Sequence, residues 1–204
     1  VADGPQLGQY LKEMNREVLS KYDGVSIGEM IGSKVDDARE YTGRDNHELD
    51  MIFQFEHVTL TPNPDKRLGK WNDERVKLTD LKASLSKWQY GLNKVGWNSL
   101  YWNNHDQPRA VSRFGNDSDE YRDVSAKMLA LVLHLLKGTP YIYQGEELGM
   151  TNAHNTSLAQ YRDLETLNAY QEIVVDEKLV SPEKMLRFFA EISRDNARTP
   201  MQWD

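Results

Sequence analysis

The sequence contains no cysteine, no long apolar run and no excess of basic residues. Without cysteine, disulfide bonds, thiolate metal sites and cysteine nucleophiles are excluded, and a reducing compartment, the cytoplasm, is expected. No segment approaches the roughly 20 apolar residues that a membrane-spanning helix needs, so we expect no membrane partner. The 32 acidic residues outnumber the 25 basic ones, for a formal net charge of −7, which argues against a nucleic-acid partner.

The length of 204 residues corresponds to one domain or slightly more. The N-terminal stretch, residues 1–5, has neither the basic nor the apolar segment of a signal peptide. The chain begins with Val1 rather than methionine, and we interpret it as a piece of a longer polypeptide.

Strand-like and helical segments alternate along the chain. Short apolar segments predict four strands, at 25–28, 49–55, 97–102 and 139–143. Apolar residues at helical spacing predict helices at 5–18, 34–41, 78–92, 119–137 and 161–174, and a last one from Ser181. We expect Thr79 to cap the helix at 78–92 and Gly138 to end the helix at 119–137. The apolar face of the 119–137 helix is predicted to consist of Val124, Met128, Leu131 and Leu135.

This alternation predicts an α/β fold of parallel strands with helices outside. A doubly wound sheet would satisfy the pattern as well as a TIM (β/α)8 barrel. The barrel is favoured because polar residues follow several successive strands, where barrel enzymes place their sites. Four strands make half of a barrel, so we expect residues 1–204 to be its C-terminal half, about strands five to eight, without the upstream half.

Acidic residues stand at the ends of two predicted strands. The strand at 25–28 is followed by Glu29, and the strand at 97–102 is followed by His105 and Asp106, before Pro108 stops further pairing. A pair of carboxyl groups delivered from different strands is typical of a sugar-cleaving site. The alternatives are a surface glutamate at Glu29 and, for Asp106, a role in the local turn network. A metal site is disfavoured because His105 has no second ligand at suitable spacing, and no cofactor is expected.

Five segments closely resemble glycoside hydrolase family 13, in its oligo-1,6-glucosidase and α-glucosidase group. They are Val25–Met30, Phe53–His57, Trp97–Arg109, Gly138–Glu147 and Arg194–Trp203. The resemblance implies that Glu29 is the catalytic acid/base and that Asp106 is the acid that orients the substrate, with His105 beside it on the sugar hydroxyls. The family's nucleophile motif, Gly-Phe-Arg-Met-Asp or similar, does not occur here and is expected before Val1. We therefore expect the 204-residue polypeptide to be inactive alone.

Three further substrate-binding residues are implied by the resemblance. Arg194 would hold the terminal glucose, and Lys70 and Glu165 would contact the sugar beyond the scissile bond. The alternatives are an ion pair of Arg194 with Asp195 or Glu165, and solvent-facing loop charges for the other two. Arg198 lies in the same polar run without an assigned role. The acids of the 144–147 segment are expected to anchor that loop.

The resemblance implies a retaining enzyme that removes glucose from the non-reducing end of short α-linked oligosaccharides, with α-1,6 linkages favoured. Trehalose-6-phosphate hydrolase is the nearest alternative activity. A non-enzymatic barrel relative that acts as a scaffold subunit is the second alternative, although such relatives usually lose the catalytic acids.

Overall fold

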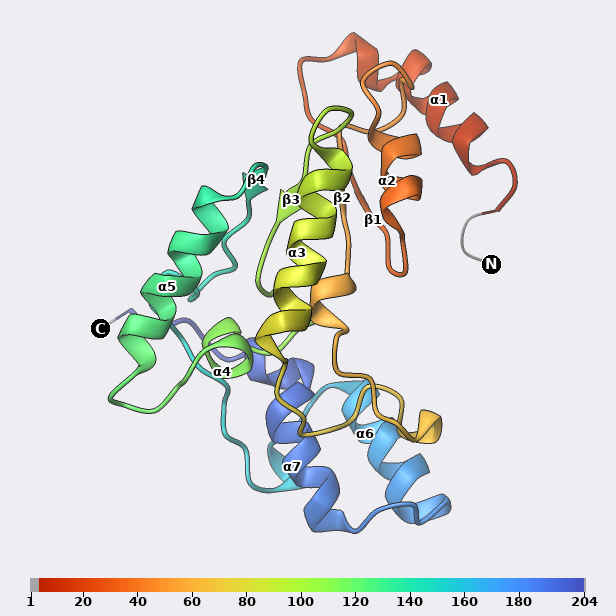
Figure 1. The fold of residues 1–204 in the computed structure, drawn as a ribbon. Helices are drawn as coiled ribbons and strands as arrows, with labels where there is room; N and C mark the ends of the chain where they lie inside the picture. The colour runs from red at the N-terminus through yellow and green to blue at the C-terminus, as the bar shows by residue number, and fades with distance from the viewer. Residues whose placement is uncertain (1–3, 204) are drawn as a thin grey trace. The chain divides into compact units, whose positions relative to one another are not determined.

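The computed structural model describes residues 4–203, which fall into two compact units. The first unit comprises the residues up to His57, Leu78–Leu100 and Leu135–Tyr141. The second comprises Val58–Lys77, Tyr101–His134 and the residues from Ile142 onward. The chain thus passes between the two units several times. Figure 1 shows the helices and strands, coloured by their position in the sequence.

The first unit contains all the strands of the described residues and three helices. The strands are β1 (Ile27–Glu29), β2 (Met51–Phe53), β3 (Ser99–Leu100) and β4 (Thr139–Pro140). The helices are α1 (Leu7–Glu17), α2 (Val35–Thr42) and α3 (Leu78–Leu92). All four predicted strands are confirmed in place, although each is shorter than predicted.

The strands pair in parallel, as the alternation of strands and helices predicted. β1 pairs with β2, with Glu29 opposite Phe53, and β3 pairs with β4, with Leu100 opposite Pro140. The ring of Tyr141, directly after β4, lies 4.7 Å from the ring of Phe53 at the end of β2. The helices α2 and α3 cover this unit's core, which consists of Ala38, Ile52, Trp88 and Leu92.

A close approach between β3 and β4 requires glycine at position 138. Gly138 has φ +155°, and a Cβ atom there would lie 2.5 Å from the carbonyl oxygen of Asn98. Its neighbour Thr139 donates its backbone N–H to that same carbonyl at 2.9 Å. A side chain at position 138 would therefore push β3 and β4 apart, whereas glycine lets them pair.

The second unit is mainly helical. Its helices are α4 (Ala110–Phe114), α5 (Arg122–Leu135, whose last residue belongs to the first unit), α6 (Leu164–Tyr170) and α7 (Pro182–Ile192). α6 continues into a π-helix, Gln171–Asp176, and a 3₁₀ helix, Arg194–Ala197, follows α7. Ser181 caps α7, because its Oγ accepts the N–H of Lys184 at 3.2 Å.

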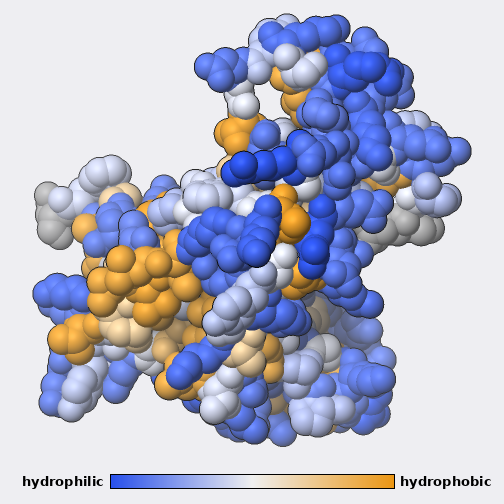
Figure 2. Space-filling model, turned by 45° about the horizontal axis from the view of Figure 1, so that its top comes forward, coloured by the Kyte–Doolittle hydropathy of each residue, from blue (hydrophilic) through white to orange (hydrophobic). Residues whose placement is uncertain are grey.

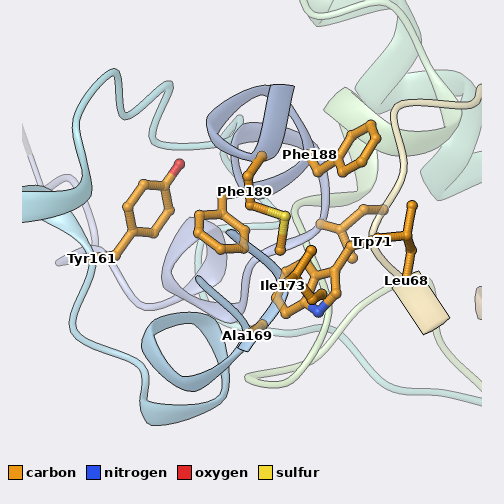
Figure 3. Close-up of a cluster of buried hydrophobic side chains, with 9 residues drawn as sticks. Leu68, Trp71, Tyr161, Ala169, Ile173, Phe188 and Phe189 are labelled. Atoms are coloured by element: carbon orange, nitrogen blue, oxygen red, sulfur yellow. The ribbon is translucent and has the colours of Figure 1, made fainter. Parts of the chain in front are cut away.

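An aromatic core holds α6 and α7 together with the 58–77 segment (Figure 3). The rings of Trp71 and Tyr161 lie 4.9 Å and 5.4 Å from that of Phe189, both edge to face. Leu68 and Trp71 come from a segment whose prolines and charges predict a loop. The segment is largely irregular, but its apolar residues anchor it in the core.

The structure corrects one detail of the helix predictions and shows which face of α5 is covered. Thr79 is not the cap of α3, because the helix already begins at Leu78 and includes Thr79. The apolar face predicted for α5 is exposed: the exposed fractions are 58% for Val124, 45% for Met128 and 60% for Leu131. The buried side of α5 instead carries Ser125, Leu129 and Leu133. Figure 2 shows apolar residues gathered on the surface at the place of α5 in Figure 1.

Candidate active site

Glu29 is the last residue of β1 in the first unit. Its side chain is exposed, at the carboxyl end of a strand whose next backbone N–H, that of Met30, is donated to the carbonyl of Phe53 at 3.1 Å. Continued pairing with β2 therefore fixes the backbone on which Glu29 is carried. The carboxyl group stands where a barrel strand presents catalytic groups.

Asp106 lies in a tight turn of the second unit, after the buried residues Trp102 and Asn103. The turn is held by Asn104, whose side-chain oxygen accepts the N–H of Asp106 at 2.8 Å and whose carbonyl accepts the N–H of Gln107 at 3.2 Å. The capping role that was the alternative for Asp106 is thus performed by Asn104. The carboxylate of Asp106 remains available for other partners.

Two arginines and a histidine surround the Asp106 carboxylate. Its Oδ1 accepts a hydrogen bond from Nη2 of Arg198 at 2.7 Å and lies 3.3 Å from Nη1 of Arg194. Its Oδ2 lies 3.5 Å from Nε2 of His105. The Asp106 side chain is 28% exposed, so these charges interact at a partly desolvated place where they attract each other more than in bulk water.

The charged cluster continues from Arg194 to Glu165 and Lys70. Nε of Arg194 lies 2.9 Å from Oε2 of Glu165, without the geometry of a hydrogen bond. Nζ of Lys70 donates to the same oxygen at 2.5 Å. The predicted alternative, an Arg194–Glu165 ion pair, is therefore present.

Five of the six residues predicted for the site thus form one connected cluster in the second unit. They are Asp106, His105, Arg194, Glu165 and Lys70. The sixth, Glu29, belongs to the first unit. In the sequence these five are scattered over residues 70–194, and the turn after Trp102, the N-terminus of α6 and the end of α7 bring them together.

A cavity of about 260 Å³ opens beside this cluster, close to the size of small-molecule sites. Its polar wall includes Lys70, Asp106, Gln107 and Arg113, and its apolar wall includes Ile192. Such a cavity offers hydrogen bonds from charged and amide side chains and apolar contact from Ile192 to the same small ligand.

A buried arginine that was not predicted supports the turn after Tyr143. Arg109 is 1% exposed; its Nη1 donates to the carbonyl of Gln144 at 2.7 Å, and its guanidinium lies 5.3 Å from the centre of the Tyr143 ring. Burial raises the pKa of Glu146, in the same turn, to about 7, against the opposing attraction of Arg109. The anchoring role expected of this loop's acids stays a prediction. The sequence contains only a weak signal for the buried role of Arg109, since this residue is simply the last one of the Asn103–Arg109 motif.

We expect Glu146→Gln to stabilise the protein above pH 7 and to change little at pH 5. Between its unfolded pKa near 4.5 and its folded pKa of about 7, the folded state binds more protons. The contribution of Glu146 to the free energy of unfolding therefore falls by about 1–3 kcal/mol as the pH rises through that window. Calorimetric melting of both full-length proteins at pH 5 and pH 8 measures this, with the exposed Glu172→Gln as control. An equal change at both pH values would contradict it.

In the part of the chain that the structure describes, no three or more His, Asp or Glu side chains are grouped to hold a metal ion. None of the helices between residues 4 and 203 combines the length and apolarity needed to cross a membrane.

The comparisons with known proteins cover the whole chain. A family model described as "Alpha amylase, catalytic domain" matches residues 1–204. An α-glucosidase of Pediococcus pentosaceus is 56% identical over 204 residues, and an oligo-1,6-glucosidase of Heyndrickxia coagulans is 54% identical over 203 residues. Each alignment spans 100% of this chain and 36% of the relative.

Among solved structures, the trehalose-6-phosphate hydrolase of Bacillus licheniformis superposes with a TM-score of 0.88 at 47% identity, over 99% of this chain and 36% of that one. The chain therefore spans about a third of the length of these relatives. Since the family model matches from the first residue to the last, the chain belongs to the α-amylase catalytic-domain family.

Proposed function

We propose that the full-length protein hydrolyses α-glucosidic bonds of short gluco-oligosaccharides from the non-reducing end with retention of configuration, and prefers α-1,6 linkages. The observation that carries this proposal is the position of the Asp106 carboxylate. It forms ion pairs with Arg194 and Arg198 and lines a cavity with polar and apolar walls. The names of the similar α-glucosidase and oligo-1,6-glucosidase agree with it.

In this proposal Glu29 is the acid/base and Asp106 orients the glucose ring. A retaining enzyme needs a protonated carboxylic acid to help the leaving oxygen depart, and Glu29 at its strand end would supply it. Asp106 and His105 would bind ring hydroxyls more tightly as the ring flattens, which lowers the barrier. No residue of the 204 is assigned as the nucleophile, so we expect these residues to need the rest of the polypeptide for turnover.

The same proposal makes the chain the C-terminal half of a (β/α)8 barrel, strands five to eight. Its support is the parallel pairing of β1 with β2 and of β3 with β4, and the relatives' greater length. The exposed apolar residues Val124, Met128 and Leu131 on α5 also support it, because an outer barrel helix would pack such a face on a neighbouring helix of the same polypeptide. We place the protein in the cytoplasm on its lack of cysteine.

The remaining roles concern the sugar at either side of the scissile bond. Arg194 would hold the terminal glucose, while Lys70 and Glu165 would contact the next sugar. Of the two cations at the cavity, Lys70 is already paired with Glu165 at 2.5 Å. The other, Arg113, donates to Oε1 of Gln107 at 2.8 Å and to the carbonyl of Val58. A paired lysine suits uncharged hydroxyls better than a phosphate group, which requires unpaired positive charge.

The second candidate activity is hydrolysis of trehalose 6-phosphate, favoured by the similarity to a trehalose-6-phosphate hydrolase over 99% of the chain. The scaffold alternative is disfavoured because Glu29, His105 and Asp106 are all present.

Steady-state kinetics of the full-length protein on isomaltose, maltose and trehalose 6-phosphate separate these activities. We expect kcat/KM to be highest for isomaltose and at least about tenfold lower for the phosphorylated disaccharide, the effect of an unmatched charged group. Highest kcat/KM on trehalose 6-phosphate would establish the second candidate. The absence of turnover on all three would leave the scaffold role.

A further inference from the structure

One guanidinium group binds three acceptors from two parts of the second unit. Nε of Arg198 donates to the carbonyl of His105 at 2.8 Å, Nη1 to Oδ1 of Asp163 at 3.0 Å, and Nη2 to Oδ1 of Asp106 at 2.7 Å. His105 and Asp106 are adjacent in one turn, so Arg198 fixes both the backbone and the carboxylate of that turn. Each of its three nitrogens has its own acceptor.

The third acceptor, Asp163, is itself rigidly held. Its side chain is 6% exposed and caps α6, because Oδ2 accepts the N–H of Thr166 at 3.2 Å. The N–H of Asp163 is bound by Oδ2 of Asp195 at 3.1 Å. Arg198 directly follows the 3₁₀ helix that contains Asp195, and donates its N–H to the carbonyl of Asp195 at 3.1 Å. The guanidinium is thus anchored to a buried helix cap at one end and reaches Asp106 at the other.

We propose that Arg198 is a positioning residue, which holds the Asp106 carboxylate in the rotation that catalysis requires. This inference rests on the proposed function of Asp106. Arg198 engages Oδ1, while among the described contacts Oδ2 has only His105 Nε2, at 3.5 Å. Fixing one carboxylate oxygen leaves the other for the sugar hydroxyls. Arg194 differs from Arg198, because its contacts are an ion pair at each end, to Asp106 and Glu165.

The planar guanidinium of arginine holds its N–H donors in fixed directions, so one side chain can bind three acceptors. A lysine at position 198 would retain the positive charge but has a single nitrogen at the end of a flexible chain, and would not keep the three acceptors in fixed directions. Arg198→Lys therefore tests orientation separately from charge. A displacement of a catalytic group by about 1 Å can cost about 10²-fold in rate.

A double-mutant cycle in the full-length protein tests this inference, with kcat and KM on isomaltose for R198K, D106N and the double variant. We expect R198K to lower kcat about 10²-fold while KM changes by less than about threefold. In the D106N background, R198K should cost less than about twofold more, because the group that it positions is already lost. Arg122→Lys, in an exposed ion pair with Asp123, is the matched control and should have no effect.

A second variant covers the case in which R198K fails to fold. Asn replaces Asp well as a helix cap, so Asp163→Asn keeps the start of α6 but removes the charge that anchors Arg198. We expect about a tenfold lower kcat with little change in KM or melting temperature. Equal losses from R198K in both backgrounds, or near-normal kcat in R198K or D163N, would overturn the positioning role alone. Near-normal turnover in D106N would instead overturn the proposed function.

Discussion

Replacing Glu29 by glutamine in the full-length protein should lower kcat on isomaltose by about 10²–10⁴-fold, the usual contribution of a general acid. Glutamine keeps the size of the side chain and cannot give up a proton to the departing sugar oxygen. Binding of the substrate should change little, because in the proposed mechanism Glu29 acts on the leaving group, and its side chain is exposed at the end of β1. Kinetics on isomaltose, with binding measured by calorimetry on the inactive variant, give both quantities.

The nature of the leaving group provides the control for the Glu29 prediction. Formation of the glycosyl-enzyme from α-glucosyl fluoride needs no proton, so this step should be far less impaired in Glu29→Gln than with isomaltose. Glu13→Gln, an exposed glutamate on α1, is the matched variant and should behave as the unchanged protein. Near-normal kcat on isomaltose in Glu29→Gln would remove the acid/base role.

Replacing Asp106 by asparagine should lower kcat by about 10²–10³-fold while KM changes much less. Hydrogen bonds to the sugar that strengthen as the ring flattens contribute several kcal/mol to the transition state. An amide keeps the shape of the carboxylate and loses the charge that makes those bonds strong. The change also leaves Arg194 and Arg198 without their shared anionic partner.

Paired measurements of kcat and KM on isomaltose test the Asp106 prediction. Asp123→Asn, at an exposed site on α5, is the matched control. If Asp106→Asn raised KM and left kcat unchanged, Asp106 would contribute to ground-state binding only, and its proposed role in the transition state would be wrong.

The sequence predicted the strands because each carries a short apolar segment bounded by glycine, proline or charge. It overestimated their length, since the ladder pairing covers only three residues of 49–55 and two of 97–102. It correctly grouped Val124, Met128 and Leu131 on one face of α5, but helical spacing does not say which face is covered. The buried side of α5 carries Ser125, which is small and polar, while the larger apolar Val124 is exposed.

The sequence predicted which residues form the cluster around Asp106 better than it predicted which of them contact each other. The Asn103–Arg109 segment pointed to Asp106 because it resembles a motif of glycoside hydrolase family 13; a histidine next to an acid would by itself have favoured a local turn network. The partnership of Asp106 with Arg198 joins residues 92 positions apart, and no local pattern encodes it. The burial of Arg109 and Glu146 likewise depends on which chain segments fold over them.

The central proposal assigns Glu29 as the acid/base and Asp106 as the acid that orients the glucose ring. A crystal structure of the full-length Glu29→Gln variant with isomaltose bound tests it most directly. We predict a terminal glucose whose ring hydroxyls are bound by Asp106, with the side chain at position 29 within hydrogen-bonding distance of the glycosidic oxygen. A sugar bound away from Asp106, or a position 29 side chain turned away from that oxygen, would contradict this proposal.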